Sequence, residues 1–133
     1  MKALFLLLIP VFLFACSNGD SGSELAASMA RGQQGYAARC LTCHMASGAG
    51  VPGVYPPLAK SDYLMADRNR AIKQTLYGAQ GEMIVNGITY NNAMPSQDLT
   101  DQEAADILNY IMNSWGNKAE SMVTPEEVLA QRK

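Results

Sequence analysis

The chain has 133 residues, of which 48% are apolar and 17% are charged, and this composition predicts one domain with a packed core rather than a disordered chain. The formal net charge is −2 at pH 7. Because a protein that binds nucleic acid needs a basic face, the charge balance argues against nucleic acid as a partner.

Residues 1–15 have the pattern of a secretory signal peptide. Lys2 is followed by an apolar run over residues 3–15, which Pro10 interrupts once. This run of 13 residues is shorter than the roughly 20 residues that a membrane-spanning helix needs. A basic start, a short apolar stretch and a small residue at its end therefore predict export from the cytoplasm.

Cys16 is a candidate lipidation site. The four residues that end at Cys16, LFAC, resemble a bacterial lipobox, in which the cysteine becomes the lipidated first residue of the mature protein. An ordinary signal peptide with an incidental cysteine is the alternative. Residues 16–23 are polar and rich in Gly and Ser, as flexible linkers are. We expect a lipid-anchored protein on the periplasmic side of a bacterial membrane, with its folded domain in residues 24–133.

Residues 24–39 predict the first helix of that domain. Ser23 is a suitable N-cap, and small or apolar positions recur after it at helical spacing. These positions are Leu25, Met29, Gly32 and Tyr36. Glycine in a helix interior is about 1 kcal/mol less favourable than alanine. A close approach by another backbone would explain Gly32, and a chance weak spot is the alternative.

This helix leads into Cys40-Leu41-Thr42-Cys43-His44, a pattern typical of covalent haem attachment. Positions i and i+3 share one face of a helix or turn, so Cys40 and Cys43 can reach the two vinyl groups on one edge of the ring. His44 follows at once and can point its imidazole at the iron, which is the usual proximal anchor. The pattern therefore predicts one covalently bound haem c.

The counts of cysteine and histidine limit the alternatives. The chain has three cysteines and one histidine. A zinc site built on Cys40 and Cys43 would need another Cys or His ligand besides His44, and the chain has none to spare. A second haem would need a second cysteine pair, and bis-histidine coordination within one chain is impossible. The sixth iron ligand must therefore be another residue, or be absent.

Residues 46–60 lack periodicity and are rich in Gly and Pro, which predicts a loop long enough to wrap one edge of a cofactor. Two short helices are expected after this loop. Ser61 is the expected cap of the first, and Asp67 is the expected cap of the second, over residues 68–77. Gly78 then ends the second helix.

Residues 79–97 predict mostly loop, with a β-like patch at residues 83–85. This region holds two of the eight methionines, Met83 and Met94, as candidates for the sixth ligand. Pro95 holds the residue before it in extended geometry, and a thioether on a rigid loop suits an axial ligand. Met94 is therefore preferred, and Met83 or an absent ligand is the alternative. Filling a gap in the core is the commoner fate of a methionine.

The last main helix is signalled by a capping box between Thr100 and Glu103. Its expected buried face consists of Ala104, Ile107, Leu108, Ile111 and Trp115. Gly116 is expected to close the helix. Thr124 and Glu127 form a second capping box, and Pro125 stands at the first helical position, which predicts a short helix to about Gln131.

With these features the chain resembles a class I monohaem cytochrome c over about residues 24–115. The resemblance implies an all-α, cytochrome c-like fold, in which the N- and C-terminal helices pack around one covalently bound haem and long loops complete the wall. It implies that Gly32 and Tyr36 pack against Tyr110. It also implies that the Pro56 carbonyl accepts a hydrogen bond from the proximal histidine, and such a bond fixes the tautomer.

A narrower likeness concerns the runs at residues 55–64, 85–90 and 114–117. They resemble small cytochrome domains fused to copper nitrite reductases and to some periplasmic dehydrogenases. Nitrite reductase, a dehydrogenase or a terminal oxidase are therefore the redox protein partners that this likeness implies. Because the chain lacks the fused enzyme, we expect a separate, monomeric carrier whose encounters with its partners are transient.

Three further residues are candidates for contacts with the haem wall or its propionates. They are Arg68, Tyr90 and Trp115. Ordinary packing or a solvated position is the alternative for each of them.

The function that these observations favour is electron transfer without enzymatic activity, by a membrane-anchored carrier with His44 and Met94 as iron ligands. One alternative is a haem enzyme or gas sensor with an open sixth position. A second is a thiol oxidoreductase that uses Cys40 and Cys43, although the βαβ pattern of such a fold is missing. A third is an exported helical binding module that folds without haem.

Overall fold

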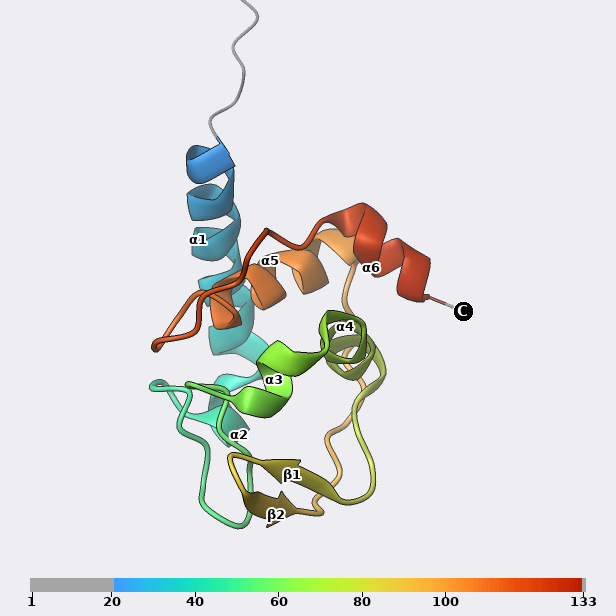
Figure 1. Cartoon of the computed structure of the whole chain (residues 1–133). Helices are drawn as coiled ribbons and strands as arrows, with labels where there is room; N and C mark the ends of the chain where they lie inside the picture. Colours follow the sequence, from blue (N-terminus) through green and yellow to red (C-terminus); the bar gives the residue numbers. More distant parts are fainter. Residues whose placement is uncertain (1–20, 133) are drawn as a thin grey trace, which may run out of the picture.

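The computed structural model describes residues 21–132. The predicted signal peptide, Cys16 and the first residues of the predicted linker lie outside this range. Figure 1 shows a mostly helical arrangement with one small hairpin. Its helices are α1 (Ser21–Arg39), α2 (Leu41–His44), α3 (Asp62–Ala66), α4 (Arg68–Tyr77), α5 (Asp101–Ile111) and α6 (Pro125–Gln131), and its strands are β1 (Met83–Val85) and β2 (Ile88–Tyr90).

The all-α prediction is confirmed, because the two strands, of three residues each, contribute little to the architecture. None of the helices between residues 21 and 132 has the length and apolar character that a bilayer span requires. The buried apolar core gathers where α1, α4, α5 and α6 meet.

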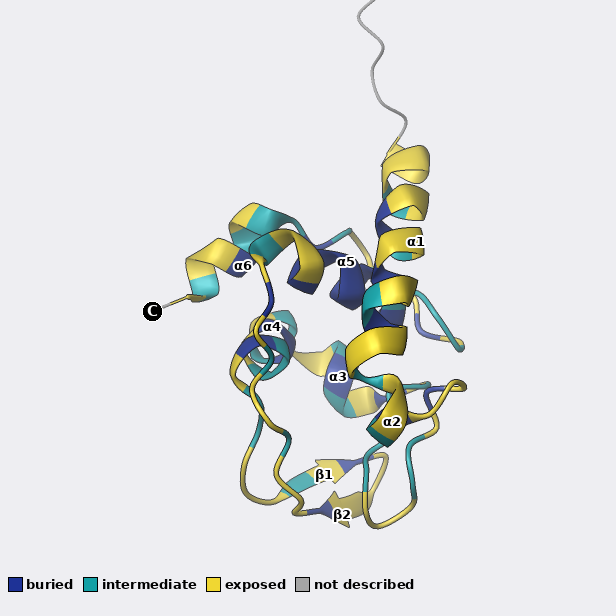
Figure 2. Cartoon of the chain, turned by 180° about the vertical axis from the view of Figure 1, so that it is seen from behind, coloured by how far each residue is buried: buried dark blue, intermediate teal, exposed yellow. Residues whose placement is uncertain are grey.

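Helices α1 and α5 cross closely and bury the faces that they turn toward each other (Figures 1 and 2). A Cβ atom on Gly32 would lie 1.9 Å from the carbonyl oxygen of Asp106, so no larger residue fits at this crossing. The expected close approach of a backbone to Gly32 is therefore confirmed. The rings of Tyr36 and Tyr110 pack beside it with centroids 5.5 Å apart, as the resemblance implied.

A buried polar network holds the crossing in register. Asp106 is 3% exposed and accepts hydrogen bonds from Ser28 Oγ at 2.6 Å and Arg31 Nε at 2.7 Å. Asn109 Nδ2 donates to Ser28 Oγ and to the carbonyl of Val123. Because each buried polar group has a partner, the network fixes α1, α5 and the segment before α6 without leaving an unpaired group.

The start of α1 differs from the prediction. Residues 21–23 are helical, although the sequence placed them in the linker and gave Ser23 the role of N-cap. Serine and glycine weaken a helix by about 1 kcal/mol or less each relative to alanine. The helix that forms over the following residues can therefore extend toward the N-terminus through residues 21–23.

The predicted caps of the middle helices are confirmed. Ser61 Oγ accepts from the Leu64 N–H at 3.1 Å, and the Asp67 carboxylate accepts from the Arg70 N–H at 3.0 Å. Gly78 closes α4. These caps fix the direction of α4, which lines the cavity of the candidate site.

The predicted β-like patch is one half of a hairpin. Strands β1 and β2 pair antiparallel, with Met83 opposite Tyr90 and Val85 opposite Ile88. Asn86 and Gly87 form the connection, both with positive φ, as a tight two-residue hairpin turn requires.

Helix α5 ends earlier than predicted. It begins with the expected Thr100 capping box but stops at Ile111, and Trp115 lies beyond it with a φ of 53°, which is outside the right-handed helical region. Asn117 Nδ2 donates to the Ile111 carbonyl at 2.8 Å. A side chain therefore satisfies the oxygen that a further helical turn would have bonded. The capping box of α6 at Thr124 is present as predicted.

Candidate haem site

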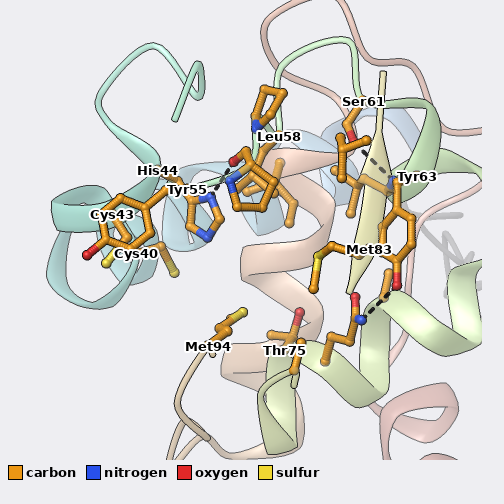
Figure 3. A pocket seen from close by; sticks show the side chains of 18 of the residues that line it. Cys40, Cys43, His44, Tyr55, Leu58, Ser61, Tyr63, Thr75, Met83 and Met94 are labelled. Atoms are coloured by element: carbon orange, nitrogen blue, oxygen red, sulfur yellow. Dashed lines mark hydrogen bonds between the residues drawn. The ribbon is translucent and has the colours of Figure 1, made fainter. Parts of the chain in front are cut away.

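A cavity lies beside the attachment motif, and Figure 3 shows side chains that line it. The cavity is partly enclosed and partly open to solvent. Its walls come from the end of α1, α2, residues 54–58, α4, residues 92–97 and α5. Most of the lining is apolar.

The attachment motif forms one end of this cavity. Cys40, Cys43 and His44 all line it. The His44 N–H donates to the Cys40 carbonyl at 3.0 Å, so the motif continues the helical path of α1 for one more turn. No disulfide joins the two cysteines. Helical spacing therefore turns both of them toward the same space, as the sequence predicted.

The Cys40 thiol does not resemble the nucleophile of a redox-active pair. Burial raises the pKa of the Cys40 thiol to about 11, and the nearby Arg39 opposes this only partly. A reactive cysteine needs a lowered pKa, because the thiolate is the nucleophile. The Cys40 environment therefore argues against the thiol oxidoreductase alternative.

His44 is held by a single oriented hydrogen bond. The residue is 7% exposed, and Nδ1 lies 3.0 Å from the carbonyl oxygen of Pro56. A carbonyl can only accept, so Nδ1 carries the proton and Nε2 keeps its lone pair. Burial lowers the pKa of His44, and the bond to Pro56 offsets this in part. A neutral imidazole with a free Nε2 is the form that binds iron.

The loop after the motif is folded tightly against it. The Gly50 N–H donates to the His44 carbonyl at 3.1 Å, and the Leu58 N–H donates to the Gly48 carbonyl at 2.7 Å. Gly50 has a φ of 62°, and a Cβ there would lie 2.6 Å from the Pro56 oxygen. Glycine at this position therefore allows the carbonyl that orients His44 to come close.

Both candidate methionines line the cavity, and Figure 3 shows Met83 and Met94 extending into the same space as the His44 ring. Their backbones are held differently. Met83 belongs to β1, where it pairs with Tyr90. Met94 lies in an isolated antiparallel bridge with Ala79, with hydrogen bonds of 2.8 and 3.0 Å.

The polar part of the cavity wall was missed by the sequence reasoning. Arg70, Tyr63 and Gln74 line the cavity. The Arg70 guanidinium lies 3.7 Å above the centre of the Tyr63 ring, and Gln74 Nε2 donates to the Tyr63 hydroxyl at 3.0 Å. Arg70 and Gln74 are four residues apart in α4 and so share a face. That spacing, applied to the predicted helix, could have identified both.

Three residues predicted as haem contacts, namely Arg68, Tyr90 and Trp115, are not part of the cavity lining. Arg68 Nη1 donates to Glu127 Oε1 at 3.1 Å, and its guanidinium also reaches the carbonyl of Ser121. Its side chain therefore fastens α6 to α4. Arg68 and Arg70 are two residues apart and point to different sides of the helix, and Arg70 is the one that lines the cavity.

Tyr90 and Trp115 lie outside the cavity lining for equally local reasons. Tyr90 is 3% exposed and is enclosed beside Met83 in the hairpin. Trp115 packs against Tyr36 with ring centroids 5.2 Å apart, and its ring covers Gly48. Trp115 therefore supports the outer side of the attachment region without lining the cavity.

The donor set fits a haem better than a bare metal ion. Within the part of the chain that the structure describes, no three Cys, His, Asp or Glu residues are placed to hold a metal ion together. The cavity instead offers two thiols and an imidazole at one end, apolar walls, thioethers and one guanidinium. This is the set that a covalently attached, largely apolar ring with an iron centre and carboxylate groups requires.

The comparisons with known proteins agree with this chemistry. Residues 29–115 match a family model described as Cytochrome c. Cytochrome c-552 of Thermus thermophilus is 37% identical over 131 residues, which cover 82% of this chain and 88% of that protein.

Two dehydrogenase subunits are also similar. The cytochrome c subunit of a quinone alcohol dehydrogenase from Gluconacetobacter polyoxogenes is 33% identical over 105 residues, covering 76% of this chain and 22% of that subunit. The cytochrome c subunit of a gluconate 2-dehydrogenase from Pantoea cypripedii is 32% identical over 107 residues, covering 74% of this chain and 23% of that subunit.

Proposed function

Because this chain belongs to the cytochrome c family of electron carriers and binds haem c covalently, we propose that His44 and Met94 are the axial ligands of one haem iron. The observation that carries the proposal is that a single apolar cavity contains the two attachment cysteines, the His44 ring and Met94. When bound, the haem supplies a one-electron couple between ferric and ferrous iron.

The role of His44 follows from its hydrogen bond. The Pro56 carbonyl takes the proton of Nδ1, which leaves Nε2 as the donor atom toward the cavity. The bond also fixes the plane of the ring and raises the basicity of the imidazole. His44 is the one histidine of the chain, so no other imidazole can take its place.

The role of Met94 follows from its place in the cavity wall. A thioether ligand raises the reduction potential of the iron. As a ligand, Met94 would also fill the sixth position, which would leave no site for a substrate or a gas. We therefore propose a carrier rather than an enzyme or a gas sensor, in line with the electron-transfer relatives of the chain.

The remaining lining supports electron transfer in two ways. Apolar side chains exclude water from the iron, and a dry site favours the less charged, reduced form. The guanidinium of Arg70 offers paired N–H donors, which suit a carboxylate. We propose that Arg70 holds a haem propionate and that Tyr63 and Gln74 keep its side chain in place.

Exchanging each methionine tests the ligand assignment, because both line the same cavity. Met94→Ala should abolish the weak iron–sulfur absorption band of the oxidised haem protein, lower its midpoint potential and let the reduced form bind carbon monoxide. Met83→Ala is the matched control and should keep the band. The assignment is overturned if Met83→Ala loses the band, or if Met94→Ala leaves the spectrum and potential unchanged.

The cellular setting is a further part of the proposal. We propose that Cys16 carries a lipid that holds the protein on the periplasmic side of the membrane. A monomer anchored there can pass electrons between redox proteins such as a dehydrogenase, a nitrite reductase or a terminal oxidase. Cys16→Ser should move the haem protein from the membrane fraction to the soluble fraction. A variant that stays with the membrane would contradict the anchor.

A further inference from the structure

The segment that carries Met94 is joined to the C-terminal end of α4 by backbone hydrogen bonds. Ala79 and Met94 exchange two of them, with lengths of 2.8 and 3.0 Å. The Gln97 N–H donates to the Leu76 carbonyl at 3.0 Å. Residues 94–97 therefore run alongside residues 76–79, although the two segments are far apart in the sequence.

Gly78 lies at the centre of this contact. It is the C-cap of α4, with a φ of 78° and a ψ of −171°, a combination that is essentially restricted to glycine. A Cβ on Gly78 would lie 2.1 Å from the Met94 oxygen and 2.8 Å from the carbonyl carbon of Pro95. Both atoms belong to the backbone, so no side-chain rotation could relieve the overlap.

We propose that Gly78 is a positioning residue for the axial thioether: it lets the Met94 backbone lie directly against the end of α4 and thereby sets the distance from sulfur to iron. The inference rests on the proposed ligation by Met94. Gly78 itself does not line the cavity, so it acts through Met94 and touches neither the haem nor the iron.

The end of α4 is a suitable reference point for this purpose. Ile72 and Leu76 are at most 2% exposed and lie in the core cluster with the buried face of α5. Packed interiors deform little, so a segment that is hydrogen-bonded to this helix is held in place by it. Met94 is thereby fixed relative to the same core that supports His44 through α1.

Gly81 provides a matched control. Its φ is 85°, so it also occupies the left-handed region, but a Cβ there would meet no atom within 4 Å. Gly78→Ala and Gly81→Ala therefore both place alanine at a positive φ, and only the former drives an atom into the Met94 backbone. The haem proteins should be compared by their oxidised spectra, midpoint potentials and carbon monoxide binding, at a temperature where both are folded.

We expect Gly78→Ala to lose most of the iron–sulfur band, to shift the midpoint potential downward and to bind carbon monoxide, while Gly81→Ala keeps the wild-type values. If Met94→Ala loses the iron–sulfur band but Gly78→Ala and Gly81→Ala have the same band, midpoint potential and carbon monoxide binding, the proposal is overturned. If Met94→Ala keeps the band, the ligand assignment itself is wrong, and the proposal about Gly78 is overturned with it.

Hydrogen exchange on the wild-type haem protein keeps the proposal testable if Gly78→Ala does not fold. The N–H groups of Ala79 and Met94 should exchange as slowly as those in the last turn of α4. Exchange as fast as at Gly81 would mean that the segment is not held by the helix, and would overturn the proposal.

Discussion

The two sides of the haem cavity are built in different ways. The His44 side is helical and local, because the His44 N–H bonds to the Cys40 carbonyl within the same turn. The Met94 side is a loop whose bridge joins Met94 to Ala79, fifteen positions earlier in the chain. One side is therefore defined by consecutive residues and the other by contacts between distant ones.

This difference explains why the His44 side of the cavity is easier to predict from the sequence than the contacts that hold the Met94 side. The spacing of Cys40, Cys43 and His44 is enough to predict the haem-attachment site, because one helical turn places these three side chains together. Pro95 makes Met94 a candidate in the sequence, but the glycine and the alanine at the end of α4, against which its backbone lies, carry no local sign of a site. The predictions below test how far the two sides differ.

The largest expected difference is between removing His44 and removing Met94. His44→Ala should almost abolish the accumulation of haem protein, because the chain has no second histidine to bind the iron. Met94→Ala should still accumulate with covalently bound haem. Haem content per polypeptide, measured from the alkaline pyridine spectrum, checks both. Equal haem content in the two variants would contradict the claim that His44, and not Met94, is needed for the haem protein to accumulate.

A second comparison concerns the backbone of the His44 side. Gly50→Ala would place a Cβ 2.3 Å from the Tyr55 oxygen, whereas a Cβ on Gly53 would have open space around it. Both positions have positive φ and so share a strain of about 1–2 kcal/mol. The overlap should lower the unfolding free energy of Gly50→Ala by about 2 kcal/mol more than that of Gly53→Ala. Denaturant titration of both haem proteins measures this difference, and equal losses would contradict it.

A third prediction concerns the helix crossing that supports the His44 side. Burial alone would raise the pKa of Asp106, but the hydrogen bonds from Arg31, Ser28 and Gln102 outweigh it and hold this pKa below its usual value. Asp106→Asn should therefore lower the unfolding free energy at pH 7 by about 2 kcal/mol, the size of a lost hydrogen bond to a charged group.

The pH dependence of that difference has a definite sign. A carboxylate with a lowered pKa in the folded state stabilises the fold above the pKa of the unfolded chain, about 3.9. This contribution is lost as the pH falls through the folded-state pKa. The gap in unfolding free energy between wild type and Asp106→Asn should therefore narrow below about pH 4. A gap that stays constant down to pH 2 would exclude this role for the carboxylate.

The smallest expected effect belongs to a hydrogen bond that links the two sides. Asn92 Nδ2, near Met94, donates to the Val54 carbonyl on the His44 side at 3.1 Å. Because Asn92 is exposed, Asn92→Ala should lower the unfolding free energy by only about 0.5 kcal/mol. Its iron–sulfur band and potential should match those of wild type. A clear shift in potential would mean that Met94 depends on this link as well as on α4.

Much of the scaffold could be predicted because its signals are local. The capping boxes at Thr100 and Thr124, and the caps at Ser61 and Asp67, all satisfy backbone N–H groups within three residues. Gly32 was identified because a glycine inside a helical pattern is unfavourable unless another backbone comes close. In each case the physical reason lies within one helical turn.

The structure departs from the sequence-based expectations where contacts distant in sequence decide the outcome. Trp115 continues the apolar spacing of α5, yet Asn117 ends the helix by bonding both Ile111 and Leu58. Arg68 and Arg70 are equally basic, and only the packing of α6 on one side of α4 assigns Arg68 to Glu127. Propensity and periodicity carry no information about such partners.

The measurement that tests the central claim most directly is the visible spectrum of the wild-type haem protein, oxidised, reduced, and reduced under carbon monoxide. Ligation by His44 and Met94 predicts a low-spin reduced spectrum that the gas does not change, together with the weak iron–sulfur band in the oxidised form. A high-spin reduced spectrum, or rapid binding of carbon monoxide, would contradict the claim and would favour a protein that uses an open iron site.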